Sequence, residues 1–116
     1  MEIFRNVGDD LGVAASLTEL GKIAISQNAV RTAEAYLGES LGLCRQLGEK
    51  IGIVGSLQSL GELMMIQNQY ESARSLYQES LNIATDLAAV RYMITAKDAL
   101  NSLSQAESGV AMEVHV

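Results

Sequence analysis

The feature that most constrains this chain is an internal repeat. Laid against itself with an offset of 40 residues, the sequence of 116 residues matches over 5–44 and 45–84. The identical pairs are Arg5/Arg45, Gly8/Gly48, Gly12/Gly52, Ser16/Ser56, Leu17/Leu57, Leu20/Leu60, Gly21/Gly61, Gln27/Gln67, Asn28/Asn68, Ala33/Ala73, Glu39/Glu79, Ser40/Ser80 and Leu41/Leu81. Periods of this length are typical of stacked supersecondary units. The sequence therefore predicts two copies of one structural unit.

Partial copies flank these two units. Leu87, Met93 and Leu100 lie 40 residues after Leu47, Ile53 and Leu60, and this correspondence fades beyond about residue 105. At the other end, Ile3, Arg5 and Val7 match Leu43, Arg45 and Leu47. We therefore expect residues 1–7 to be the end of a preceding helix, and the chain to be a segment of a longer array with about two and a half repeats.

Each unit has the pattern of two helices. In residues 9–27 and in 49–67, one stripe of residues recurs at helical spacing, which predicts a buried face in each first helix. The stripes are Val13, Ser16, Leu17, Leu20, Ala24 and Gln27, and then Ile53, Ser56, Leu57, Leu60, Met64 and Gln67. The second helices are expected at 31–45 and 71–86, with these residues facing inward: Ala33, Leu37, Leu41, Cys44, Ala73, Tyr77, Leu81 and Ala84.

Helix ends are predicted from breaker residues. Gly8 and Gly48 suit the left-handed residue that follows a helix, and the breaks within the units fall at 28–30 and 68–70. Asp9 and Glu49 place a negative charge in the first turn, where the helix dipole favours it. The repeats thus span 9–45 and 49–86, a capping helix spans 89–106, and 107–116 is expected to be a flexible tail. With no proline and no tryptophan, the composition also favours an all-α fold;.

Composition and charge exclude several functions. Eight basic and fourteen acidic residues give a net charge of −6, which argues against nucleic acid or an anionic membrane as partner;. The single cysteine, Cys44, cannot form an internal disulfide, and with His115 as the one histidine no metal-ligand spacing can be written. We expect no metal, no cofactor and no catalytic residues, because no phosphate loop, nucleophile motif or zinc motif occurs. No N-terminal segment has the pattern of a signal peptide, so a cytoplasmic location is expected.

The repeated pattern resembles a known family. Leu20, Gly21, Ala24, Asn28, Val30, Ala33, Leu37, Ser40 and Leu41 recur as Leu60, Gly61, Met64, Asn68, Tyr70, Ala73, Tyr77, Ser80 and Leu81. This spacing resembles the tetratricopeptide repeat, in a form with a period of 40 residues in place of 34, an aliphatic first position and no closing proline. The resemblance implies hairpins of helices stacked as a short right-handed superhelix.

Two glycines carry a structural prediction of their own. Gly21 and Gly61 lie in the middle of helices, where glycine costs ~1 kcal/mol relative to alanine. A close approach between the two helices of each unit would offset this cost. We predict that Ala33 and Ala73 provide the matching small surface.

The resemblance also implies a binding surface. In the family, the face of the first helices opposite their buried stripe lines a concave groove that receives peptides or helices of a protein partner. The corresponding residues here are Leu11, Ala15, Thr18, Lys22, Ile25, Ile51, Gln58, Ser59, Glu62, Met65 and Ile66. We expect Ile25, Met65 and Ile66 to act as apolar anchors, and Thr18, Gln58, Ser59 and Glu62 to set the register.

A second hypothesis concerns the two ends of the array. At the position of Leu57 the third unit has Lys97, and Asn101 and Ser104 likewise make its buried stripe polar, as expected of a capping helix. The N-terminal end has apolar Ile3, Phe4 and Val7 instead. These residues predict either a missing upstream repeat or self-association as a homodimer, so the alternative function is an oligomerisation or spacer segment of a larger regulatory protein.

Overall fold

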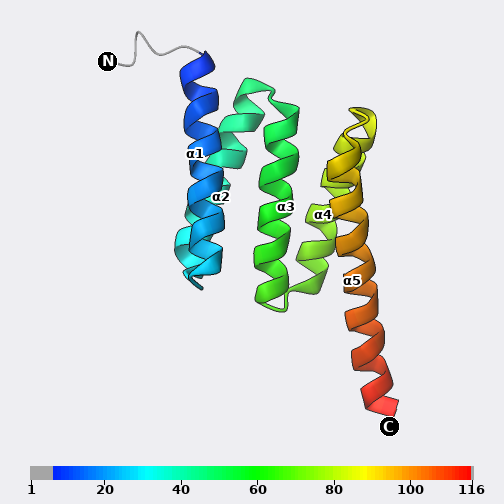
Figure 1. Cartoon of the computed structure of the whole chain (residues 1–116). Helices are drawn as coiled ribbons and strands as arrows, with labels where there is room; N and C mark the ends of the chain where they lie inside the picture. The colour runs from blue at the N-terminus through cyan, green and yellow to red at the C-terminus, as the bar shows by residue number, and fades with distance from the viewer. Residues whose placement is uncertain (1–6, 116) are drawn as a thin grey trace.

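The chain forms two layers of helices. The computed structural model describes the backbone of residues 7–115 and the side chains of residues 9–106. Its helices are α1 (Val7–Ser26), α2 (Val30–Leu47), α3 (Lys50–Ile66), α4 (Tyr70–Asp86) and α5 (Val90–His115). Residues 7–115 contain no strand, which confirms the predicted all-α fold. Figure 1 shows α1, α3 and α5 side by side in one layer, with α2 and α4 behind them. Each helix packs against the next in the chain, and the molecule measures 63 × 32 × 17 Å.

The turns between helices lie where the breaker residues predict them. Gly48 has φ 68° and its N–H donates to the carbonyl oxygen of Arg45, so it ends α2 in the left-handed conformation;. Asn28 and Asn68 have φ 59° and 61° and occupy equivalent places after α1 and α3. Ala88, with φ 54°, performs the same turn after α4 without the steric freedom of glycine;. The two hairpins therefore use the same turn at the same register.

Three predicted boundaries need correction. Gly8 lies within α1, which begins at Val7, and so it does not end a preceding helix; residues 1–6 lie outside the described part. Glu49 is the N-cap of α3 and not a member of its first turn, and its carboxylate accepts from the N–H groups of Ile51 and Gly52 at 3.1 and 3.2 Å;. α5 continues to His115, past the end predicted near residue 106. Residues 107–115 hold good helix formers and no proline, and the one glycine among them is not enough to end the helix;.

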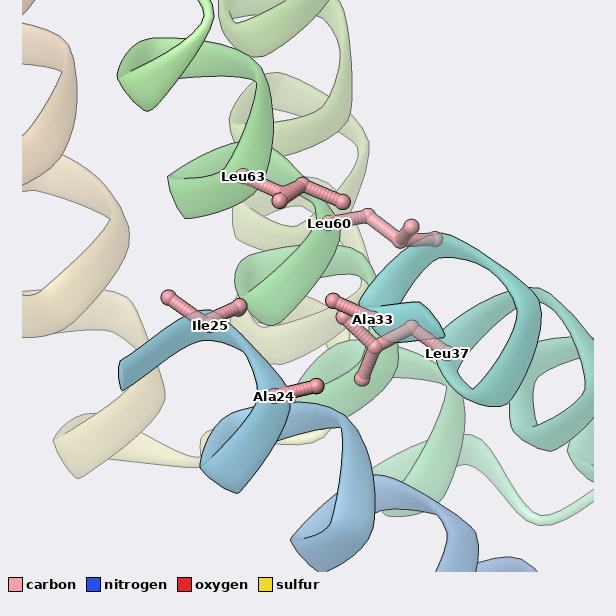
Figure 2. Packing of buried hydrophobic residues seen from close by; sticks show 6 residues of the cluster. All are labelled: Ala24, Ile25, Ala33, Leu37, Leu60 and Leu63. Carbon is pink, nitrogen blue, oxygen red and sulfur yellow. The ribbon is translucent and has the colours of Figure 1, made fainter. Parts of the chain in front are cut away.

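The core lies between the two layers. Figure 2 shows a cluster in which Ala24 and Ile25 of α1, Ala33 and Leu37 of α2, and Leu60 and Leu63 of α3 converge. Similar clusters form around Cys44, Ile53 and Leu57, and around Ala73, Tyr77 and Leu103. The inward residues predicted for α2 and α4 are confirmed, except that Leu41 and Leu81 are only partly buried.

The buried stripe predicted for α1 is wrong at several positions. Val13 and Leu20 are 38% and 42% exposed, and Ser16 and Gln27 are exposed as well. Their counterparts in α3, such as Ile53, Ser56 and Leu60, are buried because α2 covers that side of α3. No described helix covers the same side of α1. We call the residues Val13, Ser16, Leu20 and Ile23 the outer face of α1; Ile23 is 51% exposed.

The mid-helix glycines are in tight contact with the second helix of each hairpin, but the nearest atoms do not belong to the predicted partners. A Cβ on Gly21 would lie 2.5 Å from Leu37 Cγ, and a Cβ on Gly61 would lie 2.8 Å from Tyr77 Cε2. The neighbours are thus large side chains, and not Ala33 and Ala73, which lie one turn earlier on their helices. In each hairpin, a large side chain of the second helix fills the space left by the missing side chain of the glycine in the first helix.

We predict opposite effects for two Gly→Ala substitutions. Gly61→Ala gains ~1 kcal/mol of helix propensity but forces the Tyr77 ring aside, at a cost of about 1–3 kcal/mol. Gly42→Ala, on the exposed side of α2, meets nothing within 4 Å and gains propensity alone. Thermal unfolding should show a lower Tm for Gly61→Ala and a higher one for Gly42→Ala, with roughly 4–8 °C for each kcal/mol. A Gly61→Ala protein that melts at or above the parent would refute the close contact.

Candidate binding groove

A hollow runs across the layer of α1, α3 and α5. It has a volume of ≈ 600 Å³, within the range of about 300–1,000 Å³ of ligand sites. We call it the groove, and its lining residues are Ala15, Thr18, Glu19, Lys22, Ile51, Gly52, Gly55, Gln58, Ser59, Glu62, Tyr77, Tyr92 and Thr95. Among these residues, Ala15 of α1 and Gly52 and Gly55 of α3 have a methyl side chain or none. A side chain at Gly55 would meet nothing within 4 Å, so this position opens directly into the groove.

The structure brings most of the residues selected from the sequence together. Ala15, Thr18, Lys22, Ile51, Gln58, Ser59 and Glu62 all line the groove. Leu11 lies beside it, in a smaller hollow of ≈ 280 Å³ that also includes Ala15 and Ile51. The three residues expected as anchors do not line it. Ile25 belongs to the core cluster, Met65 packs partly buried near Tyr77 and Leu103, and Ile66 is exposed at the end of α3.

Sequence reasoning missed the contribution of the second layer and of α5. Tyr92 and Thr95 follow Gly52 and Gly55 by 40 residues, so extending the repeat into the third unit would have found them. Tyr77 comes from α4, and its ring reaches the groove because Gly61 leaves room above it. No periodic pattern on a first helix could have indicated that contribution.

Hydrogen bonds beneath the groove tie its helices together. Thr18 and Gln58 occupy equivalent positions and contact the equivalent buried serines of α2 and α4. The Oγ1 atom of Thr18 lies 2.7 Å from Ser40 Oγ, and Gln58 Nε2 donates to Ser80 Oγ at 3.4 Å and to the carbonyl oxygen of Tyr92 at 2.9 Å. The bond to Tyr92 joins α3 directly to α5. The two residues expected to contact a partner therefore also hold the groove in shape.

The electrostatic character of the groove differs between its two halves. In the first unit, Lys22 Nζ lies 3.4 Å from the carboxylate of Glu19, so these charges pair with each other. In the second unit, Glu62 is exposed and forms no ion pair within the described residues. Burial raises the pKa of Tyr77 to about 12, and the charge of Glu62 acts in the same direction;. The phenol of Tyr77 is therefore neutral and able to donate at physiological pH.

Cys44 is buried, as predicted, and lies under the smaller hollow. Burial raises the pKa of its thiol above the ordinary value of 9.0; the Ser40 side chain opposes this and Glu49 adds to it;. Gly52 covers the sulfur so closely that a Cβ there would lie 2.5 Å from it. The thiol is therefore protonated and shielded, which is the environment of a structural cysteine. Within residues 9–106, no group of three His, Cys, Asp or Glu side chains is arranged to hold a metal ion.

Comparison with protein-family models, with curated proteins and with solved structures finds no match to this chain. The resemblance to the tetratricopeptide repeat therefore rests on the chain's own residues. Among the described helices, none has the length and apolar character needed to cross a bilayer.

Proposed function

We propose that this chain is a non-catalytic interaction module of the tetratricopeptide type, stacked as a short right-handed superhelix, which binds a peptide or a helix of a protein partner in the groove. The observation that carries the proposal is the strip of small residues Ala15, Gly52 and Gly55 along adjacent first-layer helices, bordered by polar side chains. Small residues let a peptide backbone approach closely, and the polar border supplies hydrogen-bonding groups.

Several properties of the chain support this reading over an enzymatic one. The two carboxylates of the groove are both exposed, and one of them, Glu19, pairs with Lys22. The one thiol is shielded from the groove by Gly52. We infer that the protein works in a reducing compartment such as the cytoplasm, where cysteines do not form disulfides and a single buried cysteine is in keeping.

The groove assignment predicts a steric block. Gly55→Trp places an indole in the groove, while Gly42→Trp places the same group on the exposed side of α2, where a Cβ also meets nothing. Peptides selected from a displayed random library against the parent protein should lose about tenfold or more in affinity for Gly55→Trp, or about 1.4 kcal/mol. They should bind the Gly42→Trp protein as tightly as the parent.

Fluorescence polarisation with labelled peptides measures this difference, and circular dichroism checks that both variants keep their helicity. Selected peptides that bind the Gly55→Trp and Gly42→Trp proteins equally, or a library that yields no binder, would contradict the assignment of this groove.

The outer face of α1 favours a second role, as an oligomerisation or spacer segment of a larger protein. Its Leu20 and Ile23 correspond to Leu60 and Leu63, which α2 covers. A helix shaped like α2 would therefore fit this face, whether it came from another repeat or from a second molecule. The residues first suspected of self-association, Ile3 and Phe4, lie outside the described residues, as does the side chain of Val7.

Light scattering over a range of protein concentrations tests this second role. If the outer face of α1 mediates self-association, the parent should show a mass above that of a monomer as concentration rises, and Leu20→Glu should remove the increase. Ile94→Glu, a change at an apolar residue of α5 that is 54% exposed, is the matched control and should keep it. A monomeric mass at every concentration would count against self-association.

A further inference from the structure

Two nearly buried residues of the groove carry hydroxyl groups that have no hydrogen-bond partner among residues 9–106. Ser59 is 6% exposed and Tyr77 is 5% exposed, and both line the groove. Neither side chain forms a hydrogen bond with the described residues. Among residues 9–106, every side-chain oxygen that is fully enclosed by protein has a hydrogen-bond partner. The two hydroxyls therefore reach the open space of the groove, where a bound group can contact them.

A carboxylate lies beside these hydroxyls. Glu62 follows Ser59 by three residues, so the two side chains lie on the same face of α3, one turn apart;. Tyr77 packs under Gly61, the neighbour of Glu62. The negative charge of the Glu62 carboxylate helps to raise the pKa of the Tyr77 hydroxyl. The only lysine of the groove, Lys22, pairs with Glu19 on α1 instead. Two hydroxyl groups and one carboxylate from α3 and α4 thus line the groove without a paired cation among the described residues.

This arrangement is specific to the second unit. The positions equivalent to Ser59, Glu62 and Tyr77 in the first unit are Glu19, Lys22 and Leu37, which supply an internal ion pair and no aromatic hydroxyl. The repeat therefore does not require these three polar groups for its fold. Their coincidence in one place points to a ligand group that the first unit does not bind.

Resting on the proposed function, we propose that Ser59, Glu62 and Tyr77 bind the ammonium group of a lysine side chain carried by the segment that occupies the groove. An ammonium group has three N–H donors and one positive charge, which match two hydroxyl oxygens and one carboxylate. Because the rest of each residue is nearly buried, the Ser59 and Tyr77 side chains are held in place before binding, so little entropy is lost when the lysine binds;. The net charge of −6 favours approach of a basic segment;.

The test uses the library peptides that Gly55→Trp excludes. Among them, a lysine should recur at one position, and its replacement by glutamine should lower affinity for the parent protein by about tenfold. Against Glu62→Gln, the lysine and glutamine forms of the peptide should bind within about twofold of each other. Glu39→Gln, which removes an exposed carboxylate from α2, is the matched control and should retain the tenfold preference for lysine.

The hydroxyl groups are tested with Ser59→Ala and Tyr77→Phe. Each should reduce the preference for lysine by about threefold, since a hydrogen bond to a charged group is lost, and each should leave affinity for the glutamine peptide unchanged. Tyr77→Phe keeps the ring under Gly61, so the fold is preserved.

Peptides that bind in the groove with no preference for lysine over glutamine would overturn the lysine site and leave the proposed function standing. A preference for lysine that persists in Glu62→Gln would also overturn it. A library without any binder that depends on Gly55 would defeat the groove and the lysine site together.

Discussion

The structure depends on a steric match within each hairpin. A glycine in the first helix faces a large side chain of the second, Gly21 against Leu37 and Gly61 against Tyr77. Because the large residue occupies the space that a side chain at the glycine position would need, only glycine fits there. The cost of glycine within a helix is offset by the burial of Leu37 and of the Tyr77 ring. The same contact in both hairpins gives them the same shape, and α1 and α3 consequently lie side by side in one layer.

Most of the fold follows from the repeat, and the deviations have physical causes. The turns at Asn28, Gly48 and Asn68 were predictable because these residue types tolerate a left-handed backbone;. The exposure of the apolar stripe of α1 was not predictable. Periodicity identifies a helix face that suits burial, but it does not show whether a neighbouring helix covers that face. Leu20 and Leu60 have the same residue type and helical position, but only Leu60 lies next to a covering helix. The end of α5 was likewise not predictable, since the sequence continues past residue 106 without a proline that would end the helix.

The groove was predictable in outline and not in its chemistry. Groove residues on the first helices, such as Thr18 and Glu62, could be predicted from helical spacing and the family resemblance. The contribution of Tyr77 depends on how deeply α4 packs under Gly61, which is a tertiary property. Whether the Ser59 hydroxyl finds a hydrogen-bond partner likewise depends on the tertiary structure around it. The glycine that accommodates the Tyr77 ring thus also allows a residue of the second layer to line the groove.

The measurement that tests this account most directly is a nuclear Overhauser spectrum of the full chain. The account predicts cross-peaks from the Hα protons of Gly61 to the aromatic protons of Tyr77, and from those of Gly21 to the methyl protons of Leu37. A helical protein in which one of these contacts is present and the other is absent would contradict the claim that both hairpins are built on the same steric match.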